Sequence, residues 1–147
     1  MTSLPVQIGA EVRFAKTLGE TDFYLFSGIS GDFDKVHVNE AHMKTTAFGR
    51  RIAHGLLVLS LSSTTASMMS ARCTAEDDSF MPVSAGYDGV RFLKPVFIGD
   101  TIEVTYRIAG VEPERRRSTG KVTMTNQHGE TVLVAEHIMT WLPRAAG

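Results

Sequence analysis

An acidic residue and a histidine lie five positions apart on a glycine-led run, Gly31-Asp32-Phe33-Asp34-Lys35-Val36-His37. A carboxylate and an imidazole at this spacing could share proton transfers to and from a bound substrate. A second glycine, Gly55, opens the most apolar stretch of the chain. The N–H at a helix start is a free donor, and glycine lets a substrate carbonyl approach it. These parts suit proton movement at a carbon next to a thioester carbonyl.

Each of these residues also has a plainer interpretation. Gly-Asp is common in turns, so Asp32 alone fits a turn residue. A lone histidine such as His37 is more often structural or on the surface. Gly55 alone fits the start of a helix. The chemistry therefore depends on the combination, and on the elements that would bring the three residues together.

Three helices are expected around the glycine-led run. Thr21 can cap a helix over residues 22–27, and residues 28–37 are predicted to form a loop. Asn39 can cap a short helix over 40–48 that Gly49 ends. The main helix is predicted from 55 to about 72, with apolar or small residues on nearly every face. A helix of this composition should be buried nearly all round.

Strands are predicted for most of the remaining chain. Alternation of polar and apolar residues indicates a first strand over 11–15. Further strands are expected over 84–93, 101–111, 121–126 and 131–141, with hairpins over 112–118 and 128–130. Helices followed by an antiparallel meander are typical of an α+β fold, with one long helix against one sheet.

Composition narrows the function classes. The 147 residues are enough for one domain with a core, and 43% hydrophobic and 21% charged residues are typical of a globular protein. A formal charge of −1 argues against a nucleic-acid partner. The single cysteine, Cys73, and the spacing of His42, His128 and His137 do not predict a metal site. The sequence has no signal peptide and no membrane-spanning run, so a cytoplasmic protein is expected.

The glycine-led run resembles the signature of the MaoC-like hydratases, also called R-specific enoyl-CoA hydratases. Their motif is glycine-aspartate, any residue, asparagine, proline, an aliphatic residue and histidine. Residues 45–48, 52–57 and 94–100 are similar to the same family, in the same order, so the resemblance covers roughly 20–142. It implies a hot-dog fold, an antiparallel sheet wrapped around a long central helix, over residues 1–147 as a single domain. It also implies a homodimer with the site between subunits.

The resemblance implies reversible hydration of a trans-2-enoyl thioester, of coenzyme A or an acyl carrier, to an (R)-3-hydroxyacyl thioester. It implies no metal or redox cofactor. Asp32 and His37 take the positions of the catalytic pair, and Gly55 takes the oxyanion-hole position. Ser63 falls where the family often has a serine near the carboxylate, but it also fits a small residue on a buried helix.

Two departures from the family motif keep other functions open. The family's asparagine is Asp34 here, and its proline is Lys35. If Asp34 faced the site, its charge could disfavour ionisation of Asp32, whereas both residues also fit a solvated loop. A non-catalytic acyl-thioester-binding subunit is one alternative. A hot-dog thioesterase is another, but the stretch from Gly55 to Ala75 lacks the acidic residue that a thioesterase commonly carries on this helix.

Overall fold

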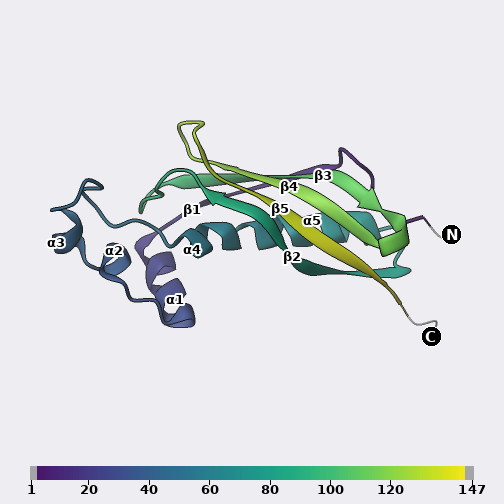
Figure 1. Ribbon diagram of the computed structural model, residues 1–147, viewed down its shortest axis with the longest axis horizontal. Coiled ribbons are helices and arrows are strands. Elements are labelled where there is room, and N and C mark those ends of the chain that lie inside the picture. The colour runs from purple at the N-terminus through teal and green to yellow at the C-terminus, as the bar shows by residue number, and fades with distance from the viewer. Residues whose placement is uncertain (1–2, 145–147) are drawn as a thin grey trace.

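The computed structural model describes residues 3–144, which form a five-stranded antiparallel sheet with a long helical segment against one face (Figure 1). The strand order is β1-β3-β4-β5-β2. The strands are β1 (Glu11–Thr17), β2 (Phe80–Phe92), β3 (Thr101–Glu112), β4 (Arg117–Thr125) and β5 (Thr131–Pro143). The α+β class and the meander of β3, β4 and β5 are as predicted.

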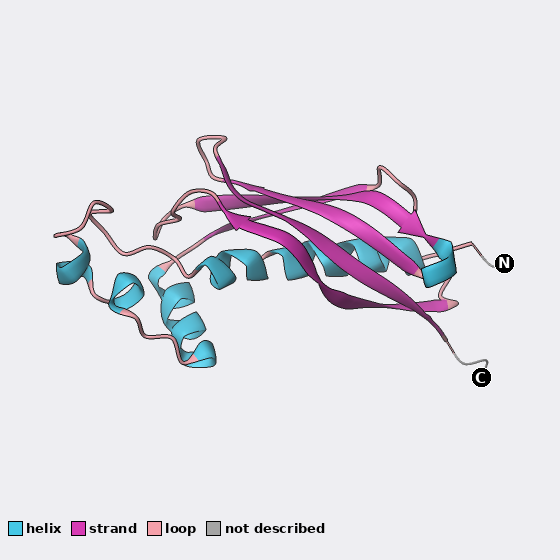
Figure 2. Cartoon of the chain, viewed as in Figure 1, coloured by secondary structure: helices cyan, strands magenta, loops and turns pink. Residues whose placement is uncertain are grey.

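The helices fall into two groups (Figure 2). They are α1 (Glu20–Ser30), α2 (Lys35–Val38), α3 (Glu40–Met43), α4 (Gly55–Ser60) and α5 (Ser62–Thr74). The α4–α5 segment runs beneath the sheet, whereas α1, α2 and α3 gather beyond one end of it. Within the described part of the chain, no helix is long and apolar enough to cross a membrane.

The predicted helix boundaries around the glycine-led run are wrong. Helix α1 begins after Gly19 rather than Thr21, because the Asp22 carboxylate accepts a hydrogen bond from the Gly19 N–H at 2.8 Å. The helix continues to Ser30 and ends where Gly31 adopts a φ of 80°. The loop is therefore shorter than the predicted 28–37, and His37 lies in α2.

The helix that Asn39 caps is also shorter than predicted. The Asn39 side chain accepts from the His42 N–H at 2.9 Å, as expected of a cap. The helix ends at Met43 rather than near Phe48. The hydroxyls of Thr45 and Thr46 each donate to a backbone carbonyl three residues earlier, at 2.8 Å, which favours turns over a continued helix.

The predicted long helix is present, but Leu61 separates α4 from α5. The backbone at Leu61 stays right-handed, with φ −62° and ψ −25°, so the helical path continues through it. The Ser60 and Ser62 hydroxyls donate to the carbonyls of Leu57 and Leu59 at 2.6 and 2.7 Å. Such bonds compete with the backbone hydrogen bonds of the helix and explain the interruption at Leu61.

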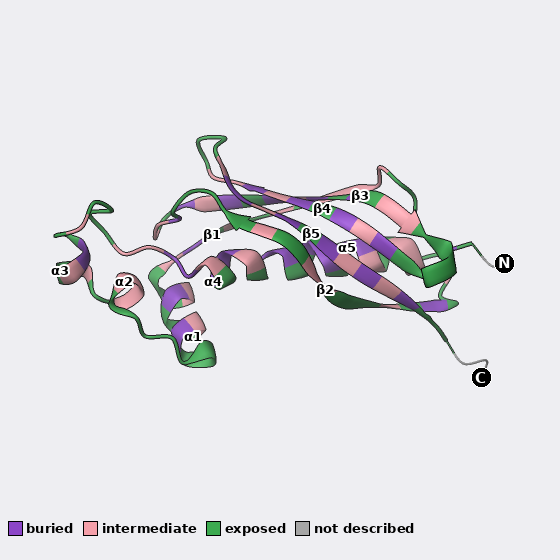
Figure 3. Ribbon diagram, in the orientation of Figure 1, coloured by how far each residue is buried: buried purple, intermediate pink, exposed green. Residues whose placement is uncertain are grey.

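The prediction that this helix is buried nearly all round is confirmed for the face toward the sheet and is wrong for the opposite face (Figure 3). The buried residues of the segment are Leu57, Val58, Leu61, Ser62, Thr65, Ala66 and Met69. In contrast, Leu56 is 60% exposed and Met68 is 38% exposed. Inward side chains alternate along β3 and β5 and meet the helix in one core. The helix is thus buried on the sheet side only.

Candidate active site

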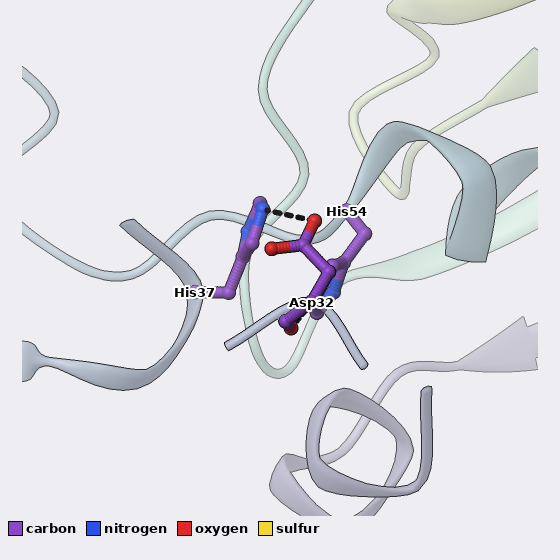
Figure 4. Close-up of side chains that lie close together, drawn as sticks. All are labelled: Asp32, His37 and His54. Carbon is purple, nitrogen blue, oxygen red and sulfur yellow. Dashed lines mark hydrogen bonds and ion pairs between the residues drawn. The ribbon is translucent and has the colours of Figure 1, made fainter. Parts of the chain in front are cut away.

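Asp32 lies in the loop between α1 and α2, where backbone hydrogen bonds fix its carboxylate. Its N–H donates to the Ser30 hydroxyl at 3.2 Å. One carboxylate oxygen, Oδ1, accepts from the Asp34 N–H at 3.1 Å. The other, Oδ2, points toward His37 and lies 3.7 Å from its Nε2 (Figure 4). One oxygen therefore holds the turn, and the other is free for chemistry.

The tautomer of His37 follows from its second contact. Its Nδ1 lies 2.8 Å from the carbonyl oxygen of Ile52. A carbonyl only accepts hydrogen bonds, so Nδ1 carries the proton and Nε2 of the neutral ring is an acceptor. Two acceptors, Nε2 and the Asp32 Oδ2, then face each other at 3.7 Å, beyond direct hydrogen-bond distance. A water molecule donating one hydrogen to each atom would satisfy both.

The segment before α4 ties the small helices to the sheet. The Ile52 N–H donates to the Val36 carbonyl in α2 at 3.1 Å, and the Ala53 N–H donates to the Val96 carbonyl at 2.7 Å. These bonds hold the Ile52 carbonyl within hydrogen-bond distance of His37 Nδ1. The segment thus fixes the position of His37 relative to the sheet.

Arg51 fastens the same segment to two helices. Its guanidinium bonds Glu20 of α1 at 2.6 Å and Glu40 of α3 at 3.1 Å. The hydrogen bond that Arg51 donates to Glu20, with a further one to Glu40, raises the pKa of Arg51 above its ordinary value. Arg51 is therefore charged at any working pH, and its side chain is only 10% exposed. The ion pairs link α1 and α3 to the segment that contacts His37.

His54 is a site residue that the sequence analysis did not assign. Its Nε2 lies 3.0 Å from the Asp32 carbonyl oxygen and 3.3 Å from the Ser27 hydroxyl, and its ring is buried. The His54 ring also stacks on His37, with centroids 3.7 Å apart (Figure 4). His54 thus contacts the backbone of one member of the pair and the ring of the other. The available signal was a histidine inside an otherwise apolar segment.

Asp32, His37 and His54 also offer ligand-type atoms within 4.8 Å of one another. Hydrogen bonds to backbone carbonyls already occupy Nδ1 of His37 and Nε2 of His54. The remaining nitrogens belong to two stacked rings, whose planes are 23° apart with centroids at 3.7 Å, so their in-plane lone pairs lie in two separate layers. The cluster therefore fits proton transfer better than the convergent geometry of a metal centre.

Gly55 opens onto an apolar groove that also reaches His37. The groove has a volume of about 410 Å³ and is lined by Phe48, Leu56, Val58, Phe92, Val96 and Val132, among others. Gly55 is the first residue of α4, so its N–H has no partner within the helix. A Cβ at this position would lie 2.7 Å from the Phe92 ring. Glycine thus leaves space where the groove meets the helix start.

Ser63 lines a different cavity, and the Asp34 side chain caps a helix although the Asp34 N–H bonds Asp32. Ser63 is exposed on α5 and lines a separate cavity, together with Tyr87 and His137. Asp34 caps α2, since its Oδ1 accepts from the Val36 N–H at 3.0 Å. Lys35 is the first residue of α2, a position at which proline is favoured in helices generally.

The cap leads to a test with a matched pair of variants. We expect Asp34→Ala to lower the free energy of unfolding by about 1 kcal/mol, because it removes the cap, and to lower activity, because α2 carries His37. Asp34→Asn keeps a cap of similar strength and should match the parent in stability. Denaturant midpoints and kcat measure both effects. An acid limb displaced to lower pH in Asp34→Asn would show instead that the Asp34 charge acts on Asp32.

Known proteins resemble this chain over most of its length. The family model described as MaoC like domain matches residues 4–132. The "(R)-specific enoyl-CoA hydratase" of Rhodospirillum rubrum is 35% identical over 120 residues, which cover 82% of this chain and 78% of that protein. The "3-hydroxybutyryl-CoA dehydratase" of Methylorubrum extorquens is 28% identical over 139 residues, covering 95% and 82%.

The fold also has solved counterparts. The structure of the (R)-hydratase from A. caviae involved in PHA biosynthesis superposes with a TM-score of 0.79 at 25% identity. The match covers 94% of this chain and 98% of that one. The hot-dog arrangement expected from the sequence, a sheet wrapped around a long helix, is thereby confirmed.

Proposed function

The chain belongs to the MaoC-like dehydratase family, and we propose from that premise that it hydrates trans-2-enoyl-CoA thioesters reversibly to 3-hydroxyacyl-CoA thioesters. Relatives named hydratase and dehydratase catalyse the two directions of one such reaction. The observation that carries the proposal is the pair of atoms, Asp32 Oδ2 and His37 Nε2, 3.7 Å apart beside an apolar groove. The enzyme is accordingly a lyase.

The proposed mechanism begins with the water that the pair can hold. One member of the pair takes a proton as the water oxygen attacks the β-carbon of the double bond. The π electrons of the double bond move toward the α-carbon and the thioester oxygen. The protonated member of the pair then gives a proton to the α-carbon. A hydroxyl and a hydrogen have thus added across the bond, and Asp32 and His37 return to their starting states.

The thioester oxygen gains negative charge during this step, and the start of α4 suits that charge. The Gly55 N–H is a free donor, and the α4–α5 segment contributes the positive end of its dipole. Donors that are already oriented toward a developing charge are among the largest contributions to catalysis. We therefore assign the thioester carbonyl to Gly55 and the acyl chain to the apolar groove. The R configuration of the product follows the named relatives.

A homodimer is the assembly we propose. Strand β2 is an edge of the sheet, and its side chains Met81 and Val83 are exposed. Leu56 and Met68 are exposed on the helix below. An unpaired edge beside exposed apolar residues favours association with a second copy by a twofold axis, with the site between subunits. Sedimentation analysis should give twice the chain mass. We place this assembly in the cytoplasm, as expected from the sequence.

Crotonyl-CoA tests the function directly. We expect the absorbance of the enoyl thioester to fall on adding the protein, with no release of free thiol. Loss of absorbance with stoichiometric thiol would identify a thioesterase, and no change in either would identify a binding subunit. The reverse reaction, measured separately with (R)- and (S)-3-hydroxybutyryl-CoA, should proceed only with the R isomer. An Asp32→Asn preparation is the control for contaminating hydratase.

A further inference from the structure

A second polar cluster lies between the sheet and α5, and the hydration chemistry does not use it. His137 of β5 is fully buried, with Nδ1 3.0 Å from the Tyr106 hydroxyl and Nε2 2.8 Å from the Ser84 hydroxyl. Burial lowers the pKa of His137 to about 4, so the ring is neutral near pH 7. Burial also raises the pKa of Tyr106. Both groups are uncharged hydrogen-bonding groups.

The local structure makes room for this cluster. Gly120 of β4 pairs with His137 across the sheet. A Cβ on Gly120 would lie only 2.1 Å from Cζ of the Tyr106 ring. The glycine therefore leaves the space through which the Tyr106 hydroxyl reaches the imidazole. Polar groups are costly to bury, so such a cluster is not simple core filling.

Counting hydrogens shows which groups remain free. If Nδ1 of His137 carried the proton, the buried Tyr106 hydrogen would have no acceptor among residues 3–144, which is costly. Tyr106 therefore donates to Nδ1, and the Nε2–H donates to Ser84. The hydrogen of the Ser84 hydroxyl is left free. The cluster thus ends in a hydrogen-bond donor.

The chain of hydrogen bonds from Tyr106 through His137 to Ser84 is the first arm of the cluster. The second arm, formed by Ser62 and Tyr87, ends in a hydrogen-bond acceptor. The Ser62 hydroxyl donates to the Leu59 carbonyl at 2.7 Å, which commits its one hydrogen. The Tyr87 hydroxyl, 2.7 Å from the Ser62 oxygen, must therefore be the donor of that contact. The Tyr87 oxygen keeps its lone pairs. Its ring packs against His137, with centroids 4.8 Å apart, so the two arms converge.

Both arms border the cavity that holds Ser63. The cavity has a volume of about 140 Å³ and is lined mainly by Ser63, Ser67, Ser70, Ser84, Tyr87 and His137. No lysine, arginine or acidic residue of the described chain lines it. The cavity is therefore polar and uncharged.

The cavity continues the line of the catalytic groove. Val58 of α4 and Phe92 of β2 line the groove, whereas Ser63 of α5 and Tyr87 of β2 line the cavity. Both hollows thus lie along the seam between the α4–α5 segment and β2. Eight residues separate Gly55 from Ser63, roughly 12 Å along a helix. An acyl chain anchored by its carbonyl at Gly55 and running along the seam would reach the cavity.

We propose that this cavity selects acyl chains that carry a hydroxyl group beyond the reacting double bond, an inference that rests on the proposed hydratase function. The hydroxyl accepts a hydrogen bond from Ser84 and donates one to the Tyr87 oxygen. An alkyl end would displace water from both groups and offer them nothing. A carboxylate end would meet no cation there.

The test compares three enoyl-CoA series of matched chain length: unsubstituted, ω-hydroxy and ω-carboxy. Absorbance assays give kcat/KM for each, over short to medium chains. At the length that reaches the cavity, we expect the hydroxylated substrate to exceed the alkyl one by about 10-fold, the scale of one net hydrogen bond. The carboxylated substrate should be the poorest. Equal values for alkyl and hydroxyl substrates at every length would overturn the proposal.

Two variants locate the preference. Tyr87→Phe and Ser84→Ala each remove one partner, and we expect each to bring the ratio of hydroxyl to alkyl kcat/KM near one. Thr64→Ala, an exposed hydroxyl of α5 outside the cavity, should keep the preference. If the preference survives in both cavity variants, the assignment is wrong. Calorimetry with saturated acyl-CoA ligands, one hydroxylated and one alkyl, measures the preference as a ratio of dissociation constants and needs no turnover. A failed hydratase assay would therefore refute the proposed function and leave the proposed preference to be decided by binding.

Discussion

Replacing either member of the Asp32–His37 pair should lower kcat by about 10²- to 10⁴-fold, because in the proposed mechanism the two side chains share one water molecule and one set of proton transfers. Residues that act as a unit are not additive, so the Asp32→Asn, His37→Ala double variant should be little worse than either single variant. Neither change should unfold the protein. The Asp32 side chain is 51% exposed, and the backbone bonds around it remain.

The measurement is single-turnover and steady-state hydration of crotonyl-CoA, with thermal melting as the check on folding. His128→Ala, in the exposed turn between β4 and β5, is a matched histidine control and should leave kcat unchanged. Near-normal turnover in both single variants would remove the pair from the mechanism. A double variant that multiplies the two losses would show that the residues act independently.

The second large effect concerns the sheet-facing side of the long helix. Leu57 and Leu61 lie one turn apart, each only 7% exposed, and both belong to the core. Truncating either to alanine should lower the free energy of unfolding by about 2–5 kcal/mol, from lost burial and the cavity left behind. Leu25→Ala on α1 is a matched control, because that side chain is 59% exposed. It should change stability by less than about 0.5 kcal/mol.

Denaturant midpoints at fixed protein concentration measure these differences, since association would make stability depend on concentration. Activity per folded molecule should survive in the Leu61 variant, because Leu61 does not line the catalytic groove. A loss below about 0.5 kcal/mol at both positions would mean that the face toward the sheet does not carry the core.

The strands were the most predictable part of the fold. Polar and apolar residues alternate over 101–111 and 131–141, which can be read directly from the sequence. Both segments are strands with an inward face. Helix boundaries were less predictable because several groups compete to cap the same turn. At α1, the carboxylate of Asp22 bonds the Gly19 N–H, and Thr21 is left inside the helix. The position of the carboxylate relative to each backbone N–H decides the competition, and the residue types alone do not give that position.

The candidate site divides in the same way. Asp32 and His37 are five residues apart on one turn, so their spacing alone placed them within reach of each other, and they lie 3.7 Å apart. Their catalytic roles stay predictions. His54 contacts Asp32 from 22 positions away, through the docking of α1 against the segment before α4. A histidine inside an apolar segment indicates a buried side chain, but it does not indicate that the side chain contacts Asp32.

The sequence by itself determined the α+β class, the strand pattern, the family and the proximity of Asp32 to His37, since each depends on neighbouring residues. Only the tertiary structure decided the stacking of His54 on His37 and the network of Tyr106, His137 and Ser84. That network joins three strands, and His137 is 31 positions from Tyr106 and 53 positions from Ser84. Strand register and the space above Gly120 set those contacts. Both arise when the sheet closes over the helix, because side-chain periodicity selects a face of a strand and not the partner it meets there.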